Sequence, residues 1–358
     1  MRHTMPHIVG FCGPMGSGKT TRSNAYMRAW TDIYGPGTAR VFSLADPVRD
    51  VVAIVLAAIP FGDGRSRAFA MRAGHSPLNE ALRSAEYKAT PMNEDLRHVS
   101  EEGLAMAATC AYITLSETPL AYRPDNTLGL LYALDEYMAN PQAVAAMPGD
   151  TAALCRVLLC VFTHNVCRAR ATSRLVTQLG VDLQIAQETL RTLVDTYGPR
   201  PSQAGAVFAS TIMGQMRAGT RVTPRTLLQT AGTEAGRGVF GEDVWAHALL
   251  RRIGAWYALY THRGTEGPPH LAIVDDVRFE NEAACVLHRE GAGDNRRTLL
   301  WCPPRTEGDT PPSTHASERD MDAWVPRYLA DGKAARAGGG VLDDVGPTFA
   351  RLLGRSEW

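Results

Sequence analysis

The sequence predicts an α/β fold with a mostly parallel, doubly wound sheet and a large helical insertion. Near the N-terminus, a short apolar run breaks into a glycine-rich loop that a helix-compatible segment follows. Strand-like and helix-like segments alternate at both ends of the chain. Between them, long alanine- and leucine-rich stretches have helical spacing. We therefore expect an α/β core from residues 1–60 and 219–358, and a helical subdomain from residues 61–218.

The glycine-rich loop carries the most specific pattern in the chain. Residues 13–20 match G-x-x-x-x-G-K-[ST], the pattern of a P-loop, directly after the apolar residues 7–12. Glycines let successive backbone N–H groups turn toward phosphate oxygens, and the next helix adds its positive end. Lys19 is expected to reach the β- and γ-phosphates, and the Thr20 hydroxyl to ligate Mg²⁺. The expected ATP-binding residues are Gly13, Gly16, Ser17, Gly18, Lys19, Thr20 and Thr21.

The composition restricts the kinds of binding partner that we expect for this protein. The chain has 358 residues with 45% hydrophobic content, enough for a substantial core. Lysine plus arginine equals aspartate plus glutamate, at 37 each, which weakens the case for a polynucleotide substrate. The seven cysteines form no C-x-x-C pair and predict reduced thiols. We find no signal-type segment and no apolar run of bilayer length, so we expect no membrane partner and a cytoplasmic protein, in the host cytoplasm if a phage encodes it.

The first α/β elements follow the loop directly. Residues 21–34 predict a helix, residues 40–44 a strand, and residues 51–59 a second helix. Loops after the carboxyl ends of parallel strands line the ligand crevice, so Asp46 and Arg49 are placed to contact a substrate. A helix cap and a solvated arginine explain the same two residues equally well.

Hydrophobic periodicity distinguishes the helical middle of the chain from the mixed strands and helices that follow it. The clearest helices expected in the insertion are residues 101–115, 128–138, 152–167 and 183–197. After it we expect an N-capped helix at 223–229, a helix from about 243 to 260, strands at 270–274 and 298–302, and a last short strand and helix in the tail.

An acidic pair ends the strand at 270–274. A carboxylate at this position beside a P-loop can hold the water shell of Mg²⁺ or accept a proton from an attacking oxygen. Strand alternation aims only one of Asp275 and Asp276 into the crevice. We assign Asp275 to the metal and Asp276 to catalysis, and which of them faces the site stays open.

Two arginines and a tryptophan are further candidates. Arg225 and Arg278 suit a phosphate acceptor because guanidinium groups match phosphate oxygens and stay charged. Each taken alone is more often a surface ion-pair partner. Trp245 offers a face for stacking a base, although tryptophan on an amphipathic helix is more commonly part of a core.

Several blocks together resemble the phage deoxynucleoside monophosphate kinase family. They cover approximately residues 5–60 and 222–350, and the stretch from 60 to 218 lies outside the resemblance. Besides the P-loop, the blocks are Phe42-Ser43-Leu44-Ala45-Asp46-Pro47-Val48-Arg49, Thr223-Pro224-Arg225, Leu228-Gln229-Thr230-Ala231-Gly232-Thr233-Glu234, Asp243-Val244-Trp245, Val274-Asp275-Asp276-Val277-Arg278-Phe279-Glu280-Asn281-Glu282 and His315-Ala316-Ser317-Glu318.

The resemblance implies a P-loop kinase that transfers a phosphoryl group from ATP, with Mg²⁺, to a nucleotide acceptor. Together with the loop and the acidic strand end, it leads us to expect catalytic roles for Lys19, Asp276 and Arg278 and metal ligation by Thr20 and Asp275. The acceptor-binding residues expected from it and from the strand ends are Asp46, Arg49, Lys88, Arg225, Gly232, Thr233, Trp245, Asp276, Arg278 and Glu282.

Two alternatives stay open at this point. Some relatives of this family phosphorylate the hydroxymethyl group of a modified pyrimidine in DNA, and the insertion would then hold modified DNA and a flipped base. A nucleotide-binding switch or assembly ATPase would use the loop to bind rather than to transfer. The insertion itself could narrow the choice of nucleotide substrate, support a homodimer, or open the site to a larger acceptor.

Overall fold

The computed structural model describes residues 6–14, 17–58, 81–115, 130, 149–169, 183–261, 270–288, 297–302, 316–331 and 334–336. The chain divides into two compact units: unit 1 is Met1–Leu44 with Ala246–Trp358, and unit 2 is Ala45–Trp245. These boundaries lie outside the expected 61–218, because residues 46–58 and 222–245 contribute side chains to the hydrophobic core of unit 2.

Unit 1 is built on a five-stranded sheet with the order β2-β3-β1-β4-β5, and all four strand pairs are parallel. The strands are β1 (His7–Cys12), β2 (Ala39–Ser43), β3 (Leu271–Val277), β4 (Arg297–Trp301) and β5 (Ala334–Arg336). The chain returns to the sheet between β1 and β2 only after unit 2, so β3 pairs with both of these early strands. Parallel pairing aligns the carboxyl ends of β1, β3 and β4 at one edge.

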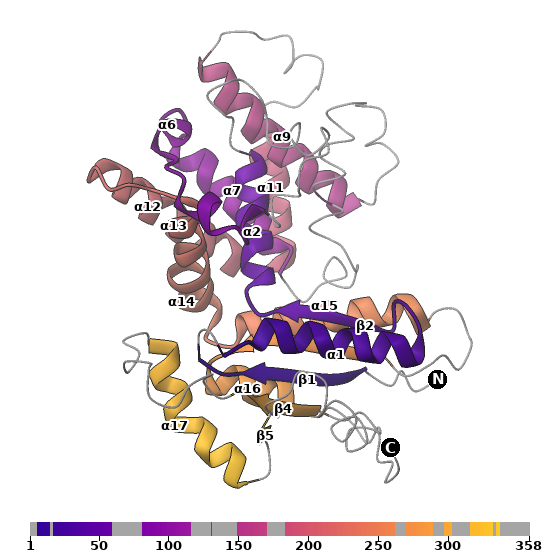
Figure 1. Cartoon of the computed structure of the whole chain (residues 1–358). Helices are drawn as coiled ribbons and strands as arrows, with labels where there is room; N and C mark the ends of the chain where they lie inside the picture. The colour runs from indigo at the N-terminus through magenta and orange to yellow at the C-terminus, as the bar shows by residue number, and fades with distance from the viewer. Residues whose placement is uncertain are drawn as a thin grey trace. The chain divides into compact units, whose positions relative to one another are not determined.

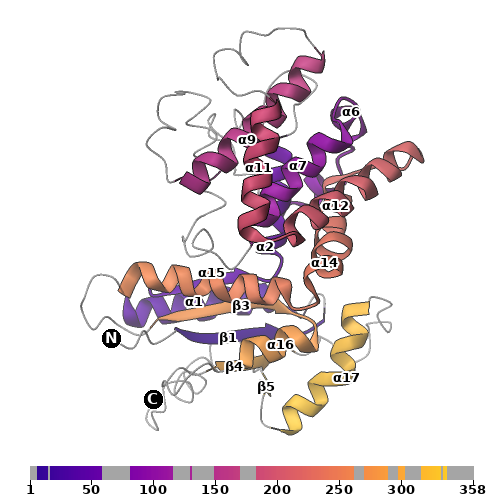
Figure 2. The same cartoon turned by 180° about the vertical axis from the view of Figure 1, so that it is seen from behind.

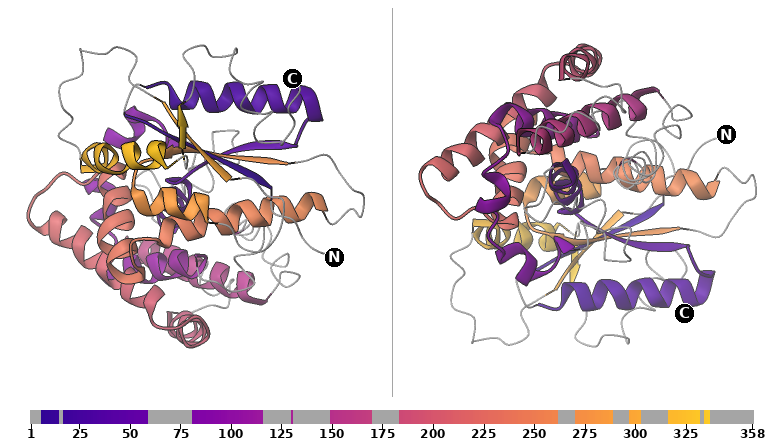
Figure 3. Two further views of the ribbon diagram at one scale, coloured as in Figure 1. Left: turned by 90° about the horizontal axis from the view of Figure 1, so that it is seen from below. Right: turned by 90° about the horizontal axis from the view of Figure 1, so that it is seen from above.

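Helices cover both faces of this sheet (Figures 2 and 3). On one face, α1 (Lys19–Tyr34) packs Tyr26 and Trp30 against Val9 and Phe11 of β1. On the other face, α15 (Val244–Thr261), α16 (Glu280–Leu287) and α17 (Ala316–Ala330) form a second cluster with Ile8 and other residues of the strands. Alternate residues of β1 therefore enter opposite layers, as buried parallel strands require.

Unit 2 is helical wherever it has regular structure in the described part of the chain (Figure 1). Its helices are α2 (Asp46–Ala58), α5 (Ala85–Ala89), α6 (Asn93–Leu96), α7 (Glu101–Ile113), α9 (Gly149–Ala169), α11 (Leu183–Tyr197), α12 (Arg200–Arg217), α13 (Pro224–Gln229), the π-helix η3 (Thr230–Arg237) and α14 (Gly238–Phe240). Helix α7 is central, since it packs against α2, α9, α11 and α12. None of the helices in the described ranges is long and apolar enough to cross a membrane.

Most expected elements in the described ranges are present, with shifted ends. Helix α2 begins at Asp46 rather than near residue 51, because Pro47 is compatible with the first turn of a helix. Strand β3 continues through Asp275 and Asp276 to Val277 instead of ending at residue 274. Thr223 caps α13 as predicted, accepting a hydrogen bond from the Thr226 N–H at 3.3 Å. Apart from Leu130, the helix expected at 128–138 lies outside the described residues, as does the tail beyond 336.

Candidate active site

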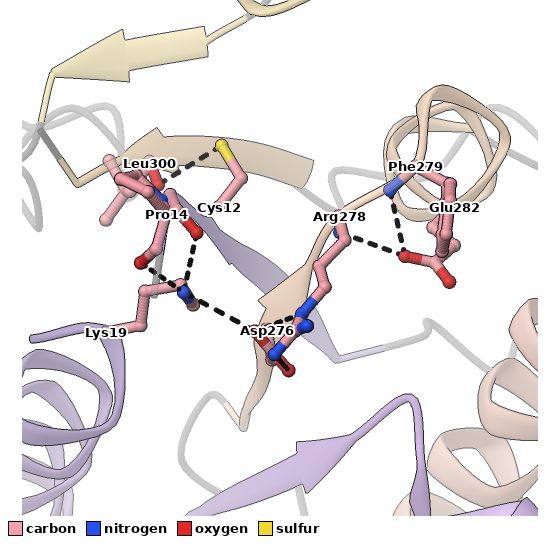
Figure 4. Close-up of polar contacts among 9 residues, drawn as sticks. Cys12, Pro14, Lys19, Asp276, Arg278, Phe279, Glu282 and Leu300 are labelled. Carbon is pink, nitrogen blue, oxygen red and sulfur yellow. Dashed lines mark hydrogen bonds and ion pairs between the residues drawn. The ribbon is translucent and has the colours of Figure 1, made fainter. Parts of the chain in front are cut away.

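Lys19 is the first residue of α1, and its ammonium group folds back over the loop that precedes the helix (Figure 4). Nζ donates to the carbonyl oxygens of Gly13 at 2.6 Å and Pro14 at 2.8 Å. It also lies 3.4 Å from Asp276 Oδ1. The Lys19 side chain is only 9% exposed, so the charge is held close to the backbone of the loop.

The described part of the loop packs closely against its surroundings, and glycine is required at two of its positions. A Cβ on Gly13 would lie 2.4 Å from the Cys302 carbonyl oxygen and 2.7 Å from Ser17 Oγ. Gly18 precedes α1 in a left-handed conformation, with φ of 80°, which favours glycine. Ser17 Oγ is buried and has no hydrogen-bond partner within the described ranges. A buried hydroxyl beside a helix N-terminus and a tightly folded loop suits an anionic ligand.

A bulge in β3 places the Asp276 side chain next to Lys19. Gly10 and Cys12 of β1 pair with Val274 and Val277, so β3 has one extra residue over this step. Asp276 adopts φ of 69°, the only positive φ among non-glycine residues in the described part of the chain. Such bulges redirect side chains and often lie next to functional sites. Because of the bulge, the side chains of β3 do not simply alternate between the two faces of the sheet at this point. Asp276, rather than Asp275, contacts Lys19.

Arg278 completes this group from the end of β3. Its guanidinium binds the Asp276 carboxylate at two points, with Nε to Oδ1 at 2.9 Å and Nη2 to Oδ2 at 2.7 Å. Asp276 therefore contacts two cations, and it is still 35% exposed. We call Gly13, Pro14, Lys19, Asp276 and Arg278 the Lys19 site.

Glu282 supports the backbone that leads away from Arg278. Its carboxylate accepts hydrogen bonds from the N–H groups of Arg278 at 2.9 Å and Phe279 at 3.1 Å, at the start of α16. Helix α17 adds a further support, because the Trp324 indole N–H donates to the Arg278 carbonyl at 3.4 Å. Glu282 is 6% exposed and is placed to hold this turn rather than to reach a ligand.

The predicted metal ligands occupy two elements of unit 1. Thr20 is exposed at the start of α1, and Asp275 is half-buried in β3, where it pairs with Ser43 of β2. In the ranges that the structure describes, no group of three or more His, Cys, Asp or Glu residues forms a metal cluster. This donor set suits Mg²⁺, which commonly takes one or two protein oxygens together with substrate phosphates and water.

Two buried thiols, those of Cys12 and Cys302, lie beside the loop. Burial, together with the neighbouring Cys302, raises the pKa of Cys12 to about 12. Burial also raises the pKa of Cys302. Both groups are therefore neutral thiols near pH 7 and neither acts as a nucleophile there. In the part of the chain that the structure describes, the cysteines that form no disulfide are Cys12, Cys110, Cys155, Cys160, Cys285 and Cys302.

A second group of predicted residues lies within unit 2. Asp46 is the first residue of α2, and its Oδ1 is 2.5 Å from Arg49 Nη1 and 2.9 Å from Arg83 Nη2. Helix α13, which carries Arg225, packs against both α2 and α5, and α5 carries Lys88. We call Asp46, Arg49, Arg83, Lys88 and Arg225 the Arg49 cluster.

The pKa of Lys88 is affected by two neighbouring arginines. Burial lowers the pKa of Lys88 from its ordinary value of 10.5, and Arg49 and Arg225 lower it further. Both charged neighbours that shift this pKa are cations, which disfavour the protonated form. The Arg49 cluster thus gathers positive charges that an anion would stabilise.

Three other predicted acceptor residues lie near η3. The Trp245 indole N–H donates to the Gly232 carbonyl at 2.8 Å, and the side chain is only 3% exposed. Tyr112 likewise donates its hydroxyl hydrogen to the Ala231 carbonyl at 2.9 Å. The Trp245 ring is covered by unit 2 itself, so it supports the π-helix and offers no free face for stacking. Thr233 remains exposed.

Sequence reasoning missed Arg83. Arg83 precedes the short helix α5, and its contact with Asp46 joins residues that lie 37 positions apart in the sequence. Two predicted features, Gly16 and the loop that contains His315, lie outside the described residues.

Comparison with known proteins adds one similarity. No family model matches the chain. A stretch of 102 residues is 30% identical to the deoxynucleoside-5'-monophosphate kinase of Escherichia phage T5. The match covers 28% of this chain and 36% of that protein, so it spans about a third of the phage kinase's length.

Proposed function

We propose that this protein is a nucleotide kinase that transfers a phosphoryl group from ATP to a deoxynucleoside monophosphate. The partial similarity to the phage T5 kinase supports nucleotide kinase activity. The observation that carries the choice of acceptor is the Arg49 cluster, where the helix of Arg225 packs against the helices of Arg49 and Lys88. A terminal phosphate brings two negative charges near pH 7, which such a cluster would stabilise.

In this proposal the Lys19 site binds the donor. Lys19 would exchange the carbonyl oxygens of Gly13 and Pro14 for the β- and γ-phosphates of ATP. Mg²⁺, held by the Thr20 hydroxyl and by Asp275, would neutralise part of the phosphate charge. Arg278, held at two points by Asp276, is ready to stabilise charge that develops during transfer.

The acceptor chemistry also defines the role of Asp276. A phosphate monoester has a second pKa of about 6, so the attacking oxygen is already ionised at neutral pH and needs no general base. Asp276 would then act by holding Lys19 and Arg278. A hydroxymethyl acceptor would instead have to lose a proton, which requires a base within hydrogen-bond reach.

The test is a transfer assay with γ-labelled ATP and Mg²⁺. The acceptors are the four deoxynucleoside monophosphates, 5-hydroxymethylated pyrimidine monophosphates, and DNA that contains 5-hydroxymethyluracil or 5-hydroxymethylcytosine. Label in a nucleoside diphosphate supports the proposal. Label only in DNA would replace it with a DNA-base kinase, and release of free phosphate at the same rate with or without acceptor would indicate a hydrolase.

Matched variants of α1 control this assay. Lys19→Ala removes the ammonium group from the loop, whereas Arg28→Ala removes an exposed charge farther along the same helix. Transfer that is lost in the first variant and retained in the second depends on the Lys19 site. Equal losses would point to a general effect on the helix.

A further inference from the structure

Helix α16 receives part of its N-terminal cap from a distant helix. The residue before it is Phe279, whose side chain has no atom that accepts a hydrogen bond. The first N–H groups of a helix have no partner within the helix, so they need acceptors from elsewhere. Glu282 supplies one locally, for the Phe279 N–H. The Glu280 N–H instead donates to Asp320 Oδ2 at 3.1 Å, across 40 residues of sequence. One acceptor for α16 therefore comes from α17.

The place of Asp320 is fixed by the apolar face of α17. Trp324 is fully buried, and its ring lies edge-on to that of Tyr328 with 5.1 Å between the centroids. Asp320 lies one turn before Trp324, so the packing of the indole also restricts where the half-buried carboxylate can be. The side chains of this face that join the second cluster of unit 1, at helical spacing, are Met321, Trp324, Val325 and Tyr328.

Three contacts from α17 reach the turn that carries Arg278. Besides the Asp320 hydrogen bond, the Trp324 indole N–H donates to the Arg278 carbonyl at 3.4 Å. Arg327 Nη2 also lies 2.8 Å from Glu280 Oε2, but these two side chains are 62% and 43% exposed. An ion pair so exposed to water adds little to stability. The contacts that can hold the turn are therefore those of Asp320 and Trp324.

The direction of the Arg278 guanidinium depends on this backbone. Its two-point contact with Asp276 requires a particular orientation of the side chain, and both side chains are about one-third exposed, at 33% and 35%. The Arg278 N–H donates to Glu282 (Figure 4), and its carbonyl accepts from Trp324. The peptide groups on both sides of the residue are thus held, one from α16 and the other from α17.

We propose that α17 positions Arg278 for phosphoryl transfer, with Asp320 and Trp324 as positioning residues. Asp320 contributes more, because its hydrogen bond is shorter and involves a charged acceptor. The inference rests on the proposed function in that Arg278 takes part in the transfer step. Both residues act through Arg278, and neither contacts a substrate.

The first measurement follows the Arg278 side chain and needs no reaction. In protein labelled with ¹⁵N-arginine, the Nε–H signal of Arg278 is identified by its loss in Arg278→Lys. We expect its exchange with water to become about tenfold faster in Asp320→Ala and about threefold faster in Trp324→Phe, because the contact with Asp276 opens more often. Asp320→Asn keeps an acceptor oxygen and should recover most of the change. Asp322→Ala, which changes an exposed aspartate of the same helix, should leave the rate unchanged.

The second measurement tests whether these contacts matter in the reaction. In Asp320→Ala we expect kcat to fall by about tenfold with both KM values unchanged, because the groups that bind the substrates remain. In protein that already carries Arg278→Ala, assayed at high enzyme concentration, Asp320→Ala should reduce kcat no further, since both changes act through one group. A general loss of stability would instead lower kcat in both backgrounds, and it would lower the melting temperature.

The outcomes separate this inference from the proposed function. An unchanged Arg278 exchange rate in Asp320→Ala overturns the inference, whatever transfer from ATP is observed. A loss of kcat that persists in the Arg278→Ala background also overturns it, because the effect then does not pass through Arg278. If the exchange rate responds as expected but no nucleoside diphosphate forms from ATP, the positioning of Arg278 stands and the kinase proposal fails.

Discussion

The Lys19 site in unit 1 and the Arg49 cluster in unit 2 both concentrate positive charge, but they neutralise it differently. In the Lys19 site, Asp276 contacts both cations and two backbone carbonyls also accept from Lys19. In the Arg49 cluster, Asp46 contacts Arg49 and Arg83, while the charged groups that shift Lys88 are themselves cations. The Lys19 site would exchange existing partners for a ligand, whereas in the Arg49 cluster a bound anion would offset the repulsion between Lys88 and its two cationic neighbours.

This difference predicts different kinetic consequences. Changes in the Lys19 site should act mainly on turnover, because its groups are aimed at charge that moves during the reaction. Changes in the Arg49 cluster should act mainly on acceptor affinity. Both patterns are measurable with one assay that separates kcat from the two KM values.

The largest expected effect is that of Lys19→Ala. Loss of the ammonium group should reduce kcat by about a thousandfold, a typical cost of removing a group that stabilises transition-state charge. The melting temperature should change little, because the Nζ contacts end within the loop and at Asp276. Near-normal turnover in this variant would remove the Lys19 site from the mechanism.

Asp276→Asn should rank second, with a fall in kcat of about a hundredfold and a smaller change in the KM for ATP. Asparagine tolerates positive φ, so the bulge should persist while the charge that orients Lys19 and Arg278 is lost. Asp275→Asn is the matched variant on the neighbouring residue. If it reduces kcat more than Asp276→Asn does, then Asp275 rather than Asp276 is the principal carboxylate.

Arg225→Ala, in the Arg49 cluster, should have a moderate effect. We expect the KM for the acceptor to rise by about tenfold, the cost of one charge-assisted hydrogen bond, with the KM for ATP unchanged. Steady-state kinetics with each substrate varied in turn checks this. A loss confined to ATP binding would contradict the assignment of Arg225 to the acceptor.

The smallest expected effect is a shift in pH dependence at Lys88. Because its pKa is lowered from 10.5, Lys88 loses its charge at a lower pH than an ordinary lysine. Acceptor affinity should therefore weaken as pH rises through this lowered pKa, and Lys88→Arg should move that decline to higher pH. The unliganded protein should behave oppositely, gaining stability over the same rise as the repulsion is relieved. An identical acceptor KM profile for Lys88→Arg and the unaltered protein would contradict this.

Contiguous patterns allowed much of the structure to be predicted from sequence. The helix that begins at Lys19, the capped start of α13 and the strand before Asp275 depend on neighbours within a few residues, so local pattern was sufficient for them. The parallel α/β character followed from the alternation of such segments. The contact between Lys19 and Asp276 was not predicted, because the sequence indicated only that one of the two carboxylates at this strand end would face the crevice.

Features that depend on distant partners were not predicted. The bulge at Asp276 arises from the register between β1 and β3, which a single strand's pattern does not contain. The contact of Arg83 with Asp46 spans 37 residues of sequence, so no local pattern indicates it. Trp245 is buried because Gly236 lies under its ring, where a Cβ would be 2.2 Å from Cζ2. The extent of unit 2 was missed for the same reason, since α2 looks like a sheet-covering helix until its packing is known.

The order of the strands has a consequence for how the protein is made. Ser43 pairs with Asp275, so the chain of unit 2 is synthesised between two residues that must become neighbours. Unit 2 is continuous in sequence and has a core of its own, and it can fold while the rest of the chain is still on the ribosome. The sheet can form only after β3 and β4 have been synthesised. A folded unit 2 also shortens the effective loop between β2 and β3, which lowers the entropic cost of closing the sheet. The helical unit would thus act as a folding aid for the α/β unit that precedes and follows it.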